Sequence, residues 1–315
     1  MILVLITHDR GAIEGSTLQG LTMARTLGDE VHAVSIGSEL AGLAEHGVAK
    51  QHVITHEELD DYSPSGWGAA LAQLTASLQP TAVLSTGTDR GNEVMAHLGA
   101  ITGHPMVANC TEVDASAGVW RVIRTRWGGS LLEEATLDAP MKLLTVTEHS
   151  IEAVPADVPG EAEVDTFIPE LAATDFVTKV VDRQVTAEGV TLATAPVVVS
   201  GGRGVGNADG FAPLEELAEL LGGVVGCSRV VTNNGWRPHS DQVGQTGTVV
   251  APDLYIACGI SGAIQHWVGM MASKTIIAIN TDAEAPMVTK SDYALVGDLA
   301  EAVPAIVSEI KARRG

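Results

Sequence analysis

The sequence predicts an α/β protein of two domains, and three observations support this prediction. Apolar, strand-like runs alternate with helix-like runs over residues 2–103, which is typical of a mainly parallel sheet covered by helices. A second series of units begins near residue 196, where strands are followed by glycine-rich turns and helices. The length of 315 residues is also enough for two separate cores.

The first domain is expected to be a parallel sheet to which antiparallel strands are added. The pattern predicts strands at residues 2–7, 31–36, 52–55 and 82–85, and helices at residues 17–27, 39–47, 66–78 and 91–103. Beyond residue 113 apolar and polar residues alternate. We therefore expect antiparallel strands at residues 119–126, 131–137 and 143–147.

Residues 151–195 are predicted to connect the two domains, because they are rich in proline, alanine and acidic residues and show little periodicity. This places an N-terminal α/β domain over residues 1–188 and a C-terminal Rossmann-like domain over residues 189–315. In the second domain, strands are expected at residues 196–200, 224–226, 253–258, 275–279 and 293–296, and helices at residues 211–221 and 263–271 and at the C-terminus.

Composition excludes several classes of function. The 39 acidic and 18 basic residues give a net charge of −21, which argues against nucleic-acid binding. The three cysteines, Cys110, Cys227 and Cys258, are widely spaced, and no zinc or iron–sulfur ligand set is visible. No apolar run reaches the roughly 20 residues of a membrane span. The apolar start, residues 1–7, is expected to be a strand and not a signal peptide, and we expect a cytoplasmic location.

Two motifs in the first domain have an ordinary structural interpretation beside a functional one. Residues 86–92 (TGTDRGN) follow a predicted strand, and they are either a capped strand-to-helix turn or a nucleotide loop. Arg121, Arg124 and Arg126 form a basic cluster on a predicted strand. This cluster is either a solvated face or a contact for a phosphate or a partner subunit.

The C-terminal domain contains two strand–glycine–helix units, an arrangement that attracts anions to free main-chain N–H groups. The first has the sequence GGRGVG at residues 201–206, with a spacing that differs from the dinucleotide motif GxGxxG. The second has the sequence GISG at residues 259–262 and leads to His266. A histidine at this place is either structural or functional, and a standard nicotinamide site is not expected.

Other residues of this domain suggest a bound ligand. Residues 241–248 (DQVGQTGT) are typical of a loop shaped around a flat molecule. Arg229 is either paired with one of the many acids or is a fixed positive charge beside the ligand, and Cys227 is expected to be a buried thiol. Asn280 and Asp298 follow predicted strands, where an adenine or ribose could lie, although Asp298 could simply cap the last helix.

These motifs occur together in one known family. The segments GGRG (201–204), GCSR (226–229), QVGQTG (242–247), GISGAIQH (259–266), INTDAEAP (279–286) and DYALVGDL (292–299) follow one another in this order. The chain closely resembles the α subunit of electron-transfer flavoproteins over residues 196–310, and more loosely over residues 1–110.

The resemblance implies a heterodimer with a β subunit, in which the C-terminal domain of this chain holds FAD and the N-terminal domain packs against β. It implies that Arg203 and Ser228 lie along the phosphates and ring, and that Val243, Gly244, Gln245 and Thr246 line the isoalloxazine. It also implies that the pyrophosphate and the pyrimidine side of the flavin are held by Ser261, Gly262, Ala263, Ile264, Gln265 and His266. Asn280, Asp298 and Leu299 would contact the adenosine.

Three residues are expected to tune the redox potential of the flavin. Reduction places negative charge near N1 and the C2 carbonyl of the ring, where His266 at a helix start is expected to supply positive potential. Arg229 would add a second positive charge, and Thr246 could donate a hydrogen bond to N5. The cofactor would then do the chemistry and the protein would set the potential, so we expect an electron carrier and no catalytic residue.

The resemblance further implies electron transfer from flavin dehydrogenases, such as acyl-CoA dehydrogenases in fatty-acid β-oxidation, to a membrane quinone oxidoreductase. The acidic surface would suit transient docking of a protein that is not itself embedded in the membrane. Two alternatives remain open at this point. One is a bifurcating or nitrogen-fixation type that accepts electrons from NADH, and the other is an NAD- or ATP-binding enzyme or regulatory module without flavin.

Overall fold

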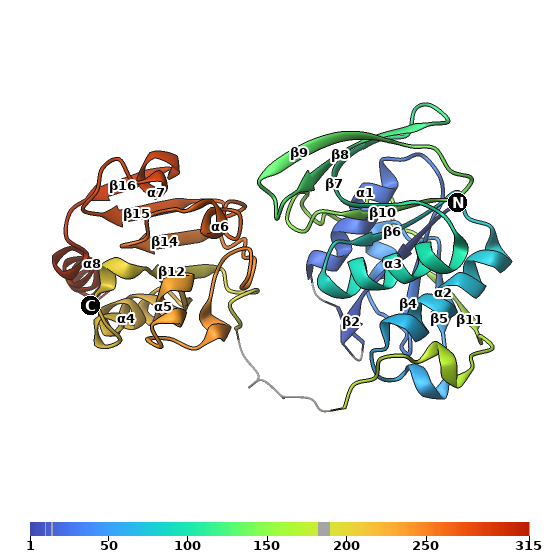
Figure 1. The fold of residues 1–315 in the computed structure, drawn as a ribbon, viewed down its shortest axis with the longest axis horizontal. Helices are drawn as coiled ribbons and strands as arrows, with labels where there is room; N and C mark the ends of the chain where they lie inside the picture. The colour runs from blue at the N-terminus through green and yellow to red at the C-terminus, as the bar shows by residue number, and fades with distance from the viewer. Residues whose placement is uncertain (10, 14, 182–189, 315) are drawn as a thin grey trace. The chain divides into compact units, whose positions relative to one another are not determined.

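The computed structural model describes residues 1–9, 11–13, 15–181 and 190–314 (Figure 1). The chain divides into two compact units, Met1–Val185 and Thr186–Gly315, each with its own sheet. Both units are mixed α/β, which confirms the predicted fold class. The boundary predicted between residues 188 and 189 lies outside the described residues.

The N-terminal unit is built on one large sheet. Among the described residues this sheet has nine strands in the order β11-β5-β4-β1-β6-β10-β7-β8-β9. The strands are β1 (Ile2–Leu5), β4 (Val31–Ile36), β5 (Lys50–Ile54), β6 (Ala82–Thr86), β7 (Met106–Asp114), β8 (Trp120–Arg126), β9 (Leu131–Leu137), β10 (Lys142–Val146) and β11 (Glu163–Phe167), and a separate hairpin joins β2 (His8–Asp9) to β3 (Ala12–Ile13).

Helices cover both faces of this sheet, as Figure 1 shows. Helix α1 (Gln19–Arg25) packs on one face with Ile2 and Val4 of β1, whereas α2 (Pro64–Leu78) and α3 (Asp89–Thr102) pack on the other face with Leu3 and Leu5. The single turns of this unit are η1 (Gly15–Leu18), η2 (Leu43–His46), η3 (Glu57–Leu59) and η4 (Ala173–Asp175).

Three expectations for this unit were wrong. The strand expected at residues 143–147 is antiparallel in the prediction, but β10 pairs in parallel with both β6 and β7 and its residues 143–146 are all buried. The stretch 39–47 forms only the turn η2 instead of a helix. Residues 151–195, read as a connection, contain β11, which extends the sheet beside β5.

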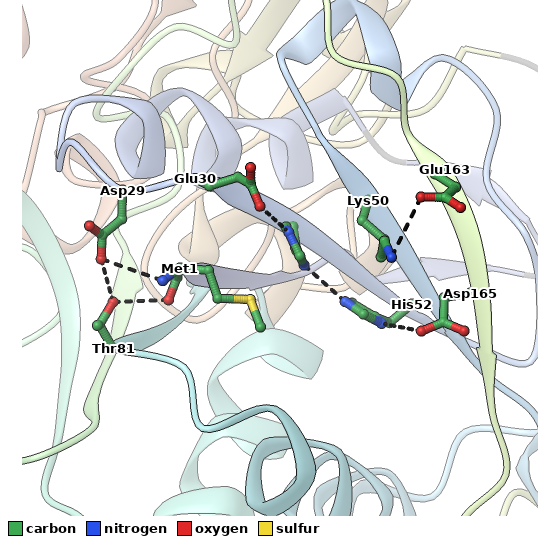
Figure 2. Close-up of polar contacts among 9 residues, drawn as sticks. Met1, Asp29, Glu30, Lys50, His52, Thr81, Glu163 and Asp165 are labelled. Atoms are coloured by element: carbon green, nitrogen blue, oxygen red, sulfur yellow. Dashed lines mark hydrogen bonds and ion pairs between the residues drawn. The ribbon is translucent and has the colours of Figure 1, made fainter.

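Histidine side chains link β4, β5 and β11, the three strands at one edge of the N-terminal sheet (Figure 2). Nε2 of His32 lies 2.8 Å from Oε1 of Glu30, and its Nδ1 lies 2.9 Å from Nε2 of His52. Nδ1 of His52 lies 3.5 Å from Oδ2 of Asp165 on β11. Burial and the neighbouring His32 lower the pKa of His52. The chain of contacts therefore joins β11 to the body of the sheet through a buried, neutral histidine.

The C-terminal unit has a parallel sheet, which among the described residues contains five strands in the order β13-β12-β14-β15-β16. The strands are β12 (Val197–Gly201), β13 (Val224–Cys227), β14 (Leu254–Cys258), β15 (Ile276–Asn280) and β16 (Tyr293–Val296). The helices are α4 (Ala212–Leu220), α5 (Arg229–Asn233), α6 (Ile264–Trp267), α7 (Pro286–Lys290) and α8 (Leu299–Arg314), with turns η5 (Arg203–Val205), η6 (Asp209–Phe211) and η7 (His239–Asp241).

The two faces of this sheet have different coverings. Helices α4 and α8 pack together with Val199 and Ile256 on one face. On the other face, Tyr255 and Ala257 pack with Val243, Met270 and Met287, which belong to the loops and short helices. No helix in the described part of either unit is both long and apolar enough to cross a membrane.

Candidate functional site

A cavity of about 790 Å³ lies where the strands of the C-terminal sheet end. It is lined by the turns that follow β12, β13, β14, β15 and β16, which is the place where open parallel sheets bind ligands. Its volume falls within the range of about 300–1,000 Å³ that is usual for sites of small molecules and cofactors. The sheet therefore gathers glycine-rich turns from distant parts of the sequence around one ligand-sized space.

Two arginines supply positive charge to this cavity. Arg203 begins η5, directly after β12, and Arg229 begins α5, directly after β13. Within the described ranges neither guanidinium forms an ion pair with a carboxylate, although the chain carries 39 acidic residues. This favours the functional interpretation of Arg229, because an arginine left unpaired in so acidic a chain is available to an anionic ligand.

Two buried polar atoms on residues of the cavity wall have no hydrogen-bond partner among the described residues. They are Oγ of Ser228 and Nδ1 of His266. A buried polar atom without a partner costs about 1–3 kcal/mol, so each such atom calls for an explanation. A molecule bound in the cavity could form hydrogen bonds with both atoms through its polar groups, which would explain why the chain leaves them without a partner.

The surroundings of His266 determine its charge state. Its side chain is 7% exposed, and burial lowers its pKa to about 4, although the main chain of Val243 that faces the ring opposes this shift. Helix α6, which carries it, has only four residues and so offers little helix dipole. At neutral pH the imidazole is therefore neutral, and the predicted role of His266 beside the flavin stays a prediction.

The loop at residues 242–248 packs against the start of α6. Val243 is buried, and the main-chain N–H of Gln245 donates to the carbonyl of Gln265 at 2.7 Å. Gly244 has φ of +140°, and a Cβ there would lie 2.8 Å from the same carbonyl oxygen. This close approach requires glycine.

Thr246 lines a second hollow that adjoins Arg229. This hollow of about 410 Å³ is formed by Arg229, Thr232, Asn233, His239, Gln242 and Thr246. Oγ1 of Thr246 accepts a hydrogen bond from Nε2 of Gln242 at 3.0 Å. The hydroxyl proton of Thr246 therefore remains available to a ligand, as its predicted role requires.

Two residues of the cavity wall, Asn280 and Asp298, also hold loops in place. Nδ2 of Asn280 donates to the carbonyl of Ile260 at 2.9 Å, and its Oδ1 accepts from the N–H of Asp282 at 3.0 Å. Oδ1 of Asp298 accepts from the N–H of Ala300 at 2.9 Å, at the start of α8. Both residues thus have a structural role beside the predicted contact with a ligand.

Most of the predicted site residues meet in this cavity. Its wall includes Arg203, Ser228, Arg229, Ser261, Ala263, Gln265, His266, Asn280, Asp298 and Leu299. Of the other predicted residues, Thr246 faces the adjoining hollow, and five lie outside both linings, namely Val243, Gly244, Gln245, Gly262 and Ile264.

Sequence reasoning missed several residues of the wall. They are Gly204, Val230, Gly259, Ile260, Thr281, Asp282, Ala285 and Gly297. Each lies in the same turns as a predicted residue, so their position at the carboxyl ends of strands was a usable signal.

The other motifs have structural explanations. Oγ1 of Thr88 accepts from the N–H of Gly91 at 3.1 Å, so residues 86–92 include a capped helix start. Arg124 and Arg126 of the basic cluster both pair with Glu133 on β9. Cys227 is a free and buried thiol, and burial raises its pKa to about 12.

Comparison with known proteins agrees with this geometry. Residues 2–172 match the electron transfer flavoprotein domain, and residues 191–271 match the electron transfer flavoprotein FAD-binding domain. The chain is 39% identical to electron transfer flavoprotein subunit alpha of Mycobacterium leprae, with 99% of both chains covered. It is 34% identical to the protein of the same name from Bacillus subtilis, with 98% of this chain and 97% of that one covered.

The chain belongs to the electron transfer flavoprotein α-subunit family. The predicted resemblance is thereby confirmed, and FAD is the cofactor of the C-terminal unit. The residues present fit this cofactor. Arg203 and Arg229 are unpaired cations in the described part of the chain that suit a pyrophosphate and a reduced ring, and the unpartnered atoms of Ser228 and His266 suit its polar groups.

Proposed function

We propose that this chain is the α subunit of a heterodimeric electron carrier, in which the cavity of the C-terminal unit holds FAD. When bound, FAD supplies the redox chemistry, and the residues of the chain bind it and set its potential. The observation that carries the proposal is the meeting of two unpaired arginines and two unpartnered buried atoms around one cavity of the described structure. The family match to an FAD-binding domain supports it.

Each group has a defined part in this proposal. Arg203 and the turn at residues 259–262 would hold the phosphates, while Ser228 and His266 would bond polar groups of the cofactor. Arg229 would place a positive charge near the ring. The hydroxyl of Thr246 would donate a hydrogen bond to the edge of the ring. Positive charge and hydrogen-bond donors favour the electron-rich reduced form over the oxidised form, so they raise the potential.

We further propose that the N-terminal unit serves as the scaffold that packs against a β subunit. The electrons would come from flavin dehydrogenases such as acyl-CoA dehydrogenases and would pass to a membrane quinone oxidoreductase. The net charge of −21 supports transient docking to basic partner surfaces, which would weaken with added salt.

The test is to co-purify the chain with its β subunit and to record its visible spectrum and its flavin content. One FAD per heterodimer, reduced by a reduced acyl-CoA dehydrogenase and not by NADH alone, is the expected result. Two flavins with reduction by NADH would instead support the bifurcating type. A colourless protein that binds NAD would contradict the proposal.

A further inference from the structure

A tyrosine hydroxyl lies deep in the apolar face of the C-terminal sheet. Tyr255 on β14 is fully buried and packs among Val243, Met270 and Met287. A phenylalanine would fill this space equally well, and a buried hydroxyl without a partner would be costly. The hydroxyl must therefore be explained by what it contacts.

The hydroxyl of Tyr255 contacts the histidine of the cofactor cavity. Oη of Tyr255 lies 2.9 Å from Nε2 of His266. This bond holds the imidazole from the side of the core, while Nδ1 of the same ring is the buried atom that lacks a partner among the described residues. The ring thus has Nε2 held by Tyr255, whereas Nδ1 forms no hydrogen bond among the described residues, and the main chain of Val243 faces the ring.

The direction of this hydrogen bond decides where the proton of His266 resides. Burial raises the pKa of Tyr255, although the hydroxyl of Ser200 beside it opposes the shift, so the phenol keeps its proton at neutral pH. A phenol that donates to Nε2 requires that Nε2 carry no proton, which leaves the single proton of the neutral ring on Nδ1.

We propose that Tyr255 is a positioning residue, which donates to Nε2 of His266 and keeps the imidazole proton on Nδ1, directed to FAD. This inference rests on the proposed function, in which FAD occupies the cavity. Tyr255 would make His266 a neutral hydrogen-bond donor of fixed orientation. Such a donor stabilises the reduced ring without a full charge.

The first test is the tautomer of His266, observed by long-range ¹H–¹⁵N NMR of the FAD-loaded heterodimer with ¹⁵N-labelled histidine. The signal is assigned by its loss in a His266→Gln variant. We expect a neutral ring with its proton on Nδ1, and we expect the proton on Nε2 to prevail in Tyr255→Phe. A proton on Nε2 in the unmodified protein would overturn the proposal, and this outcome does not depend on whether the variant folds.

The second test is the midpoint potential of bound FAD in Tyr255→Phe, His266→Ala and the double variant. Tyr255→Phe is expected to shift the potential in the same direction as His266→Ala, and the double variant is expected to show no shift beyond that of His266→Ala. A Tyr255→Phe shift that adds fully to that of His266→Ala would mean that Tyr255 acts independently. Tyr293→Phe, on the exposed strand β16, is the matched control and should leave the potential unchanged.

The two failures can be told apart. A heterodimer without FAD would contradict the proposed function. A heterodimer that holds FAD, and whose potential responds to His266→Ala and not to Tyr255→Phe, would contradict only the positioning role of Tyr255.

Discussion

Replacing Gly262 by alanine is expected to destabilise the C-terminal unit and to weaken FAD binding. Gly262 has φ of +80°. This left-handed conformation costs a residue with a side chain about 1–2 kcal/mol. An added Cβ would also lie 2.3 Å from the main-chain nitrogen of Met287 and 2.7 Å from its Cα, so α7 would have to move.

The size of the effect follows from these two contributions. Overpacking typically costs about 1–3 kcal/mol, so the total loss is about 2–5 kcal/mol. This is a large part of the roughly 5–15 kcal/mol that stabilises most proteins. Movement of α7 would break the bond from the N–H of Met287 to the carbonyl of Ser261, which is 3.1 Å long, and so would displace part of the cavity wall.

Gly235→Ala is the matched control for this prediction. Gly235 has φ of +71°, and a Cβ there would meet no atom within 4 Å. It should therefore show only the conformational cost of about 1–2 kcal/mol. The assay is urea unfolding of both variants with an unchanged slope, together with FAD titration. Equal stability of the two variants, within about 0.5 kcal/mol, would refute the reasoning from the Met287 contact.

Three further predictions address the cofactor and the pH dependence. Ser228→Ala should leave the stability of the apoprotein unchanged but raise the Kd for FAD roughly two- to tenfold, about 0.5–1.5 kcal/mol, in equilibrium dialysis; an unchanged Kd would contradict the role of its hydroxyl. Arg229→Gln should lower the midpoint potential of bound FAD in spectroelectrochemical titration. Arg229→Lys should lower this potential much less, because the positive charge is retained. Because folding lowers the pKa of His52, the imidazole of the unfolded chain takes up a proton at a higher pH than that of the folded chain. The N-terminal unit should thus hold its full stability above about pH 6.5 and lose part of it at lower pH, and denaturation of His52→Gln should show a flatter dependence.

Much of the fold could be predicted because apolar and alternating strands carry their own signal. The runs at residues 31–36, 131–137 and 293–296 form β4, β9 and β16 with the predicted bounds. Apolar or alternating residues of this kind specify strands from local sequence alone.

The elements that were missed lack such a signal. Every residue of β11 from Glu163 to Thr166 is exposed, so no apolar periodicity marks this edge strand. The parallel pairing of β10 with β7 depends on sheet order, which local alternation does not contain. The short helices α5 and α7, of five residues each, are too brief to show helical periodicity.

The site residues show the same contrast between features that local sequence indicates and features that only the folded structure determines. Its residues could be located because they lie at the carboxyl ends of strands, next to glycines, and because the family resemblance ordered them. The charge of His266 could not be predicted. The imidazole is neutral because Tyr255, eleven positions earlier in the chain, and the surrounding apolar residues bury it, and this burial is a property of the folded structure.

The central claim is that FAD is bound by the cavity of the C-terminal unit through Arg203, Ser228 and their neighbours. The most direct measurement is the flavin content of the purified heterodimer, compared with that of an Arg203→Gln/Ser228→Ala double variant of equal thermal stability. We expect one tightly bound FAD in the unmodified protein and loss of this flavin during gel filtration of the variant. Full retention of FAD by the variant would contradict the account.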